Sequence, residues 1–324
     1  MGRANVIKRV AAVIVVVVCL LPSSAGAGEI GYEVRASVHN LLEPSQFERR
    51  IDLFGTVPVV EEIWQVAGDP GTAEGYATHY SGVAANYGSI AVISEATSGG
   101  TYPSVSGPPF NPVEATGSAY GLVTIDDLTF SGPSNVIPGV TLTVNVSGYL
   151  DTVANAITSN NWVDSAARVD IRVKLNSGGS IHEFDGFRVI RAEENPNDGF
   201  FTSDDSFHDM VGYTLGDPIV IGPFTAFATS AATLELFLGV SSSTDLTFGE
   251  GFTRGSSQFG STMSLPTTGP VFDLPAGFSV NSASANIVNN EWLNTPVGLA
   301  IPVPGTLMVM LGGMGAFVMR RGRG

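Results

Sequence analysis

Apolar and polar residues alternate along three stretches of this chain, 140–150, 167–175 and 234–240. Valine, leucine, isoleucine or alanine occupies every second position except Gly148, and most residues between them are polar or charged. In a β-strand, successive side chains point to opposite faces, so this period of two places one set in a core and the other toward water. The three stretches therefore predict strands of a sheet that is buried on one face.

Less regular apolar runs predict further strands at 88–94, 118–130, 181–190, 219–228, 257–265 and 278–288. Turn signals such as Ser177-Gly178-Gly179 and Asn197-Asp198-Gly199 separate them. No helical period occurs outside the two ends of the chain. Short strands, polar-out alternation and frequent glycine and proline favour an all-β fold, an antiparallel β-sandwich of jelly-roll type.

We expect this sandwich to occupy residues 28–295. The stretch 101–116 contains four prolines, Pro103, Pro108, Pro109 and Pro112. It fits either a linker after a small N-terminal unit or a long loop within one domain, because all-β domains of this length occur. We favour a single domain.

The first 27 residues have the three parts of a secretory signal peptide. Arg3, Lys8 and Arg9 form a positive start, 10–21 is apolar, and Ala25-Gly26-Ala27 is a small-x-small cleavage site. Cleavage after Ala27 would remove Cys19, the only cysteine. The exported part would then hold no disulfide, thiolate metal site or cysteine nucleophile.

The exported part is strongly acidic. It carries all thirty Asp and Glu against nine Lys and Arg, a net charge of −21. Such a surface repels nucleic acid and anionic membranes and favours association with cations. Nucleic-acid binding is therefore excluded as a function class.

The last segment, 296–324, has the composition of a membrane anchor. No charged residue lies between Glu291 and Arg320, and 306–319 is an unbroken apolar run. A full span needs roughly 20 apolar residues, which the run reaches when counted back through Val297. Arg320, Arg321 and Arg323 follow as a stop-transfer cluster expected to stay in the cytoplasm. We therefore expect a C-terminal transmembrane helix.

The order of parts in this segment resembles the PEP-CTERM sorting signal of Gram-negative bacteria. The matching positions are Pro302, Pro304, Gly305 and Thr306, followed by the helix and the arginine cluster. One departure is Val303, where the family usually has glutamate. The resemblance implies processing near the motif by an exosortase, an integral-membrane protease or transpeptidase. The β-rich region before the tail is similar in texture to ectodomains that carry this signal.

One acidic segment is a candidate calcium loop, and no other cofactor is expected. Oxygen donors alternate along it and a turn glycine, Gly199, follows; the candidate ligands are Glu193, Asn195, Asn197 and Asp198. Calcium takes six to eight oxygen ligands from flexible loops of this kind. The spacing departs from the EF-hand pattern, so a solvated acidic hairpin loop is the alternative.

Motifs for catalysis are few. The four histidines, His39, His79, His182 and His208, have no metal-ligand spacing, and no G-x-S-x-G elbow is present. Carboxylate pairs for glycoside hydrolysis would be sought beside an aromatic sugar platform. Two places fit that description, Glu61-Glu62 near Trp64 and Glu183 near Phe184. Trp292, next to the tail, is expected at the membrane interface.

These features predict a non-enzymatic protein exported by the Sec machinery. We expect transient anchoring in the inner membrane with the ectodomain in the periplasm, then processing by exosortase and release to the outer surface or the medium. The expected role is a structural or glycan-binding module of an extracellular polysaccharide or biofilm layer. The alternative is a secreted hydrolase or lyase that acts on polysaccharide.

Overall fold

The computed structural model describes residues 28–40, 43–55, 59–67, 76–101, 113–156, 162–195, 200–208, 215–248 and 250–299. In these ranges the regular structure consists of β-strands, and every pairing between strands is antiparallel. The expected all-β antiparallel fold is confirmed. The strands form two large sheets and one small hairpin.

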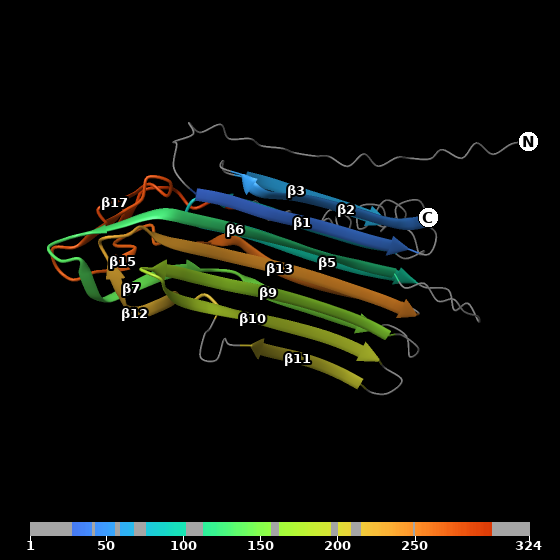
Figure 1. Ribbon diagram of the computed structural model, residues 1–324. Helices are drawn as coiled ribbons and strands as arrows, with labels where there is room; N and C mark the ends of the chain where they lie inside the picture. The colour runs from blue at the N-terminus through green and yellow to red at the C-terminus, as the bar shows by residue number, and fades with distance from the viewer. Residues whose placement is uncertain are drawn as a thin grey trace, which may run out of the picture.

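The first sheet has the strand order β11-β10-β9-β13-β6-β1-β2, with β16 paired to β6 (Figure 1). Its strands are β1 (Gly28–Asn40), β2 (Glu43–Gly55), β6 (Val113–Ser131), β9 (Trp162–Ser177), β10 (Ser180–Asn195), β11 (Phe200–His208), β13 (Ala232–Phe248) and β16 (Ser279–Asn281). Half of the neighbouring pairs in this order, β9-β13, β13-β6 and β6-β1, are distant in sequence, so the sheet joins parts of the chain from both halves.

The second sheet has the order β12-β7-β14-β5-β4-β3, with β15 paired to β7 and β8 paired to β14. Its strands are β3 (Val59–Ala67), β4 (Tyr76–Asn86), β5 (Ser89–Thr101), β7 (Val136–Val146), β8 (Tyr149–Ala156), β12 (Ile219–Phe227), β14 (Glu250–Ser264) and β15 (Phe272–Asp273). Figure 1 shows β5 behind the first sheet and β7, β12 and β15 at one end. The hairpin of β17 (Ile287–Val288) and β18 (Glu291–Trp292) lies at the same end.

The alternating stretches are strands, as predicted. The stretches 167–175 and 234–240 lie within β9 and β13, and 140–150 covers most of β7 and the start of β8. The apolar members Val144, Ile171 and Leu236 are 0% exposed. The less regular run 278–288 is divided between β16 and β17. The strands β1, β2, β3, β4, β11, β15 and β18 were not predicted.

The main core lies between the two sheets. One cluster of buried side chains draws on both, for example Ile30 and Leu236 from the first sheet and Val92 and Leu142 from the second. Burial of this much aliphatic surface, at about 25 cal/mol per Å² of apolar area, is the main stabilising contribution to folding.

Strands on both sides of the proline-rich stretch contribute to this core. The strand β5 ends at Thr101, β6 begins at Val113, and residues 102–112 lie outside the described ranges. The strand β1 pairs along its length with β6, and Ile30 and Val123 belong to the same cluster. The segments before and after the stretch therefore share one hydrophobic core.

A layer of buried hydroxyl groups joins the sheets next to the main core. In this layer, Ser94 Oγ lies 2.8 Å from Ser242 Oγ, and Ser98 Oγ lies 2.7 Å from Thr244 Oγ1. Thr253 Oγ1 of β14 donates to the carbonyl of Asp164 on β9 at 2.8 Å. Each of these hydrogen bonds runs from one sheet to the other. Because a buried hydroxyl without a partner costs about 1–3 kcal/mol, the layer favours this one alignment of the sheets.

The sheets approach closely at this layer because its residues are small. A Cβ atom added to Gly117 of β6 would lie 2.3 Å from Cε1 of His79 on β4. One added to Gly255 of β14 would lie 2.3 Å from the carbonyl oxygen of Ala166 on β9. No side chain fits at either position, so glycine is required for the observed spacing.

A bulge in β6 forms hydrogen bonds with the C-terminal part of the domain. The register against β13 shifts between Leu234–Ile125 and Ala232–Leu128, which leaves one extra residue on β6 at Asp126-Asp127. The Asp127 carboxylate accepts hydrogen bonds from the Ser284 hydroxyl at 2.7 Å and the Ser284 backbone N–H at 2.9 Å. Burial opposes ionisation, but these hydrogen bonds and the one from the Ser282 hydroxyl outweigh it and lower the pKa of Asp127.

The expectation for Trp292 was wrong. Its side chain is 4% exposed and belongs to the main core. The indole Nε1 donates to the carbonyl of Tyr87 at 3.2 Å, and the ring packs on Gly88. An amphipathic ring with a single N–H donor suits this buried position as well as a membrane interface.

Both termini lie outside the described residues. This applies to the signal-cleavage positions Ala25 and Ala27, to the sorting motif and to the arginine cluster, which stay predictions. Among the residues that the structure does describe, no helix is long and apolar enough to cross a membrane.

The buried alternation in β7 can be tested by placing a charge in the core. Val144→Asp should lower the free energy of unfolding by more than about 4 kcal/mol, because an unpaired carboxylate would enter an apolar site. The control is Asn145→Asp, at the next residue along the strand, which is exposed. This change should alter the free energy of unfolding by less than about 0.5 kcal/mol. Urea unfolding followed by circular dichroism measures both, and equal stability of the two variants would show that Val144 is not in the core.

Candidate functional site

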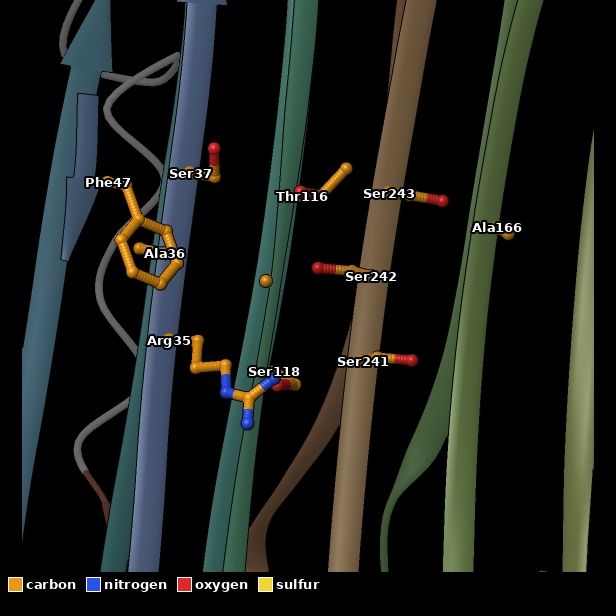
Figure 2. Close-up of a pocket in the computed structure, with 11 residues that line it drawn as sticks. Arg35, Ala36, Ser37, Phe47, Thr116, Ser118, Ala166, Ser241, Ser242 and Ser243 are labelled. Carbon is orange, nitrogen blue, oxygen red and sulfur yellow. The ribbon is translucent and has the colours of Figure 1, made fainter. Parts of the chain in front are cut away.

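The outer face of the first sheet contains a shallow trough. It has a volume of about 380 Å³ and crosses β1, β6, β13 and β9 (Figure 2). The lining residues are Arg35, Ala36, Ser37, Phe47, Thr116, Gly117, Ser118, Ala166, Ser241, Ser242 and Ser243. Neighbouring strands lie about 4.8 Å apart, so the trough extends roughly 14 Å from β1 to β9.

Strand register explains why the trough forms here. Ser37, Thr116, Ser243 and Ala166 lie directly opposite one another on the four neighbouring strands. Two residues along, Ser118 lies opposite Ser241. These side chains are small and point outward, as Figure 2 shows for Ser241 and Ser243, whereas Ser242 between them points the other way. Larger residues on the surrounding rows leave the hollow between them.

The trough offers hydrogen-bonding groups and one exposed ring. Serine and threonine hydroxyls both donate and accept, and the Arg35 guanidinium only donates. The Phe47 ring of β2 stands at one end with 65% of its surface exposed. An exposed phenylalanine beside a row of hydroxyl groups offers both apolar contact and hydrogen bonds to a ligand.

A buried carboxylate positions the arginines at this end. Glu33 is 3% exposed and accepts hydrogen bonds from Arg35 Nε, from Arg49 Nε at 2.6 Å and from Tyr120 Oη at 2.9 Å. Burial raises the pKa of Glu33, but the three hydrogen bonds outweigh it and hold the pKa below its usual value. Glu33 therefore stays ionised at neutral pH and orients Arg35 beside the trough.

Aromatic and arginine side chains cover the sheet on one side of the trough. The Arg168 guanidinium lies 4.3 Å from the centre of the Phe187 ring, and Arg168 Nε donates to Asp170 at 2.8 Å. The rings of Tyr120 and Phe237 lie 5.7 Å apart. These contacts hold planar groups in fixed orientations on the outer face, where they extend the surface available to a ligand.

A row of carboxylates borders the other side. Glu114, Asp245, Asp164 and Glu193 lie opposite one another on β6, β13, β9 and β10. Like charges directly opposite one another destabilise a sheet, and an arginine offsets part of this repulsion. Arg191 Nη2 lies 2.6 Å from Asp164 Oδ2 and 3.5 Å from Glu193 Oε2.

One predicted calcium ligand, Glu193, lies at this border. Glu193 and Asn195 belong to β10, and Asn197 and Asp198 lie outside the described residues. Within the part of the chain that the structure describes, no group of three or more His, Asp or Glu side chains is arranged to hold a metal ion. Calcium binding at 193–198 stays a prediction from the sequence.

The two expected sugar platforms lie apart from the trough. Trp64 is 41% exposed on the outer face of the second sheet, and its ring lies 5.8 Å from that of Tyr80. Phe184 packs against the main core. The trough residues were not singled out from the sequence. The available signal was the run Ser241-Ser242-Ser243 inside an alternating strand, which places two serines outward and one inward.

One histidine has serine neighbours but is inaccessible. His79 is 1% exposed; its Nδ1 lies 3.3 Å from Ser81 Oγ, and its Nε2 lies 3.2 Å from Ser94 Oγ and 3.3 Å from Ser242 Oγ. Burial lowers the pKa of His79 to about 3. A base this weak and this deeply buried cannot activate a serine for a substrate in solution. The role of His79 is therefore to form hydrogen bonds within the buried hydroxyl layer.

Comparisons with protein-family models, with curated proteins and with solved structures returned no significant match.

The shifted pKa of His79 predicts acid sensitivity. Below pH 6.5 the unfolded chain takes up a proton on this histidine, and the folded protein does not until about pH 3. Stability should therefore fall with pH by up to about 1.4 kcal/mol per unit, or about 2 kcal/mol between pH 7 and pH 5. Urea unfolding at the two pH values measures this contribution.

The histidine variants identify the residue responsible. His79→Gln keeps a polar group near Ser94 and Ser242 and should remove about 2 kcal/mol of the difference between pH 7 and pH 5. His182→Gln, a half-buried position stacked on Phe224, should retain that contribution. A His79→Gln protein with unchanged pH dependence would contradict the assignment.

Proposed function

We propose that this protein is a non-enzymatic module that binds an extended, hydroxyl-rich polysaccharide in the trough. The observation that carries this proposal is the row of small outward side chains across four neighbouring strands, three of which contribute hydroxyl groups, with Phe47 and Arg35 at one end. A polysaccharide presents hydroxyl groups along its length and apolar faces on its rings. An open trough that crosses the strands suits a chain that extends beyond both ends.

The rigidity of the trough supports a binding role. Its floor is built on paired strands, and Arg35 is held by an ionised carboxylate. Side chains that are fixed before binding lose little conformational entropy on contact with a ligand. The jelly-roll connection of the strands, which we also propose, is found in other proteins that bind ligands on a sheet face, although fold alone does not define function.

A hydrolase or lyase is the other class, and it requires a proton donor beside the substrate. A carboxyl group that acts as a general acid needs a raised pKa so that it is protonated at neutral pH. Glu33 and Asp127 are shifted in the opposite direction and are held ionised by hydrogen bonds. We therefore favour the binding module.

For location, we propose export followed by sorting through the C-terminal signal. The supporting features are the signal peptide, the charge-free apolar tail and the terminal arginines. The partners would be the export machinery, the inner membrane and an exosortase, and the destination an extracellular polysaccharide layer.

Filling the trough tests the binding site. Ser243→Phe should lower the affinity for a bound polysaccharide at least tenfold, because the ring would occupy the centre of the floor. Thr233→Phe is the matched control, since Thr233 lies on the same strand and the same face but near its other end. A glycan array first identifies a ligand of the unmodified protein, and isothermal titration then compares the variants. Equal losses in both variants, or no glycan bound by the unmodified protein, would contradict the proposal.

Removing the tail tests the sorting signal. Deletion of residues 306–324 should release the β-domain into the periplasm or medium, because the anchor would be lost. Deletion of 322–324 alone is the control; it keeps Arg320 and Arg321 and should leave the protein associated with the membrane until it is processed. Cell fractionation with immunoblotting measures both, and a shortened protein that stays in the membrane fraction would count against the anchor.

A further inference from the structure

Two arginines share one carboxylate at the Phe47 end of the trough. Arg35 of β1 and Arg49 of β2 both donate through Nε to Oε1 of Glu33, and the other oxygen of Glu33 accepts from Tyr120 Oη. Arginine side chains keep their positive charge in proteins, and these hydrogen bonds keep Glu33 ionised. Two positive charges and one negative charge leave this cluster with a net charge of +1.

The positive charge of this cluster is accessible from the trough. The side chains of Arg35 and Arg49 are 46% and 44% exposed, whereas the Glu33 side chain is buried. Arg35 lies directly opposite Ser118 on β6, and Figure 2 shows its side chain extended toward that serine. A ligand in the trough therefore meets the guanidinium of Arg35 and not the carboxylate that balances part of its charge.

The arginine at the opposite end of the trough carries no such excess. Arg168 of β9 lies opposite Ser241, and its Nε and Nη2 both donate to the carboxylate of Asp170. One arginine and one carboxylate cancel each other. The positive excess is therefore confined to the end of the trough that β1 and β2 form.

The carboxylates that border the trough lie too far away to cancel this excess. Glu114 and Asp245 are four residues along β6 and β13 from Ser118 and Ser241, which is about 13 Å at 3.3 Å per residue. Exposed charges separated by more than about 8–10 Å are largely screened at physiological ionic strength. The negative charge of the whole domain slows the approach of an anion, but inside the trough the direct contact with Arg35 has the larger effect.

We propose that the polysaccharide bound in the trough is acidic, and that Arg35 binds one of its carboxylate groups. This inference rests on the polysaccharide-binding function proposed above. The planar guanidinium fits a carboxylate through two parallel hydrogen bonds, which gives both affinity and orientation. The hydroxyl groups of Ser118 and Ser241 then contact sugar hydroxyls, and the exposed Phe47 ring packs on the apolar face of a sugar ring. Sugars of the uronic acid class carry these three features together.

Isothermal titration with matched polymers tests this proposal. The probes are polygalacturonate and alginate, each compared with the same polymer after its carboxyl groups have been reduced to primary alcohols. Dextran sulfate is a further probe, because it carries negative charge without carboxylate groups. The unmodified protein should bind at least one of the two polyuronates about tenfold more tightly than its reduced form and than dextran sulfate, since only the carboxylate pairs with the guanidinium fork.

The variant Arg35→Gln identifies the residue responsible. It should lower the affinity for the bound polyuronate about tenfold and leave the affinity for the reduced polymer within about twofold. Glu33 keeps its hydrogen bonds from Arg49 and Tyr120 in this variant, and circular dichroism checks that the fold is retained.

The matched control is Lys174→Gln, which also removes one positive charge from the outer face of the first sheet. Lys174 pairs with Glu235 at 3.1 Å and lies eight residues along β9 from Ala166, about 26 Å at 3.3 Å per residue. This variant should change each affinity by less than about twofold, because the lost charge is outside the screening distance.

Four results would overturn the proposal. Equal binding of the acidic and reduced polymers, or tighter binding of the reduced ones, would leave a polysaccharide site that does not recognise acid groups. An equal loss of affinity for both forms in Arg35→Gln would show that Arg35 only shapes the trough. Tighter binding of dextran sulfate, or an equal effect of Lys174→Gln, would show attraction by charge alone. Binding of none of the polymers would contradict the proposed function as well.

Discussion

The fold depends on the close approach of two sheets across a layer of small polar residues. Aliphatic side chains supply most of the buried area, but they would tolerate several alignments of one sheet on the other. The hydroxyl pairs Ser94–Ser242 and Ser98–Thr244 are compatible with only one alignment of the sheets. If a strand shifted by one residue, each hydroxyl group would lose its hydrogen-bond partner. Gly117 and Gly255 keep the gap narrow enough for these hydrogen bonds to form. Without cysteines in the domain, these contacts take the place that disulfides have in many exported proteins.

The same small residues explain the candidate site. Along β13, Ser242 points inward to the hydroxyl layer, and Ser241 and Ser243 point outward to the trough. Along β6, Gly117 makes room for His79 inside, and Thr116 and Ser118 line the trough outside. Small side chains on both faces of these strand segments thus produce a narrow core on the inner side of the sheet and a hollow on its outer side. The tight packing between the sheets and the hollow on the outer face have one structural cause.

The sequence predicted those strands in which one face is aliphatic and the other polar, such as β7, β9 and β13. It did not indicate β4, because Ala84 and Ala85 are buried on opposite faces and no alternation remains. The trough was not predicted either, since Ser37, Thr116 and Ser243 come from strands far apart in the chain and resemble turn residues when read singly. Trp292 was assigned to a membrane by its position next to the tail, although Tyr87 and Gly88, more than 200 residues away, form its site. Long-range strand pairing is the information that a single sequence lacks.

The strand order of the first sheet also constrains when the domain can form. The strand β13 lies between β6 and β9, so the centre of the sheet stays open until residue 248 has been synthesised. Before that point, β6 and β9 each have an unpaired edge. The inner face of the second sheet is then covered by only part of the first sheet. Unpaired edges and exposed apolar faces are the features that lead partly folded chains to aggregate. Protection of the growing chain is therefore most needed during synthesis of its first three quarters.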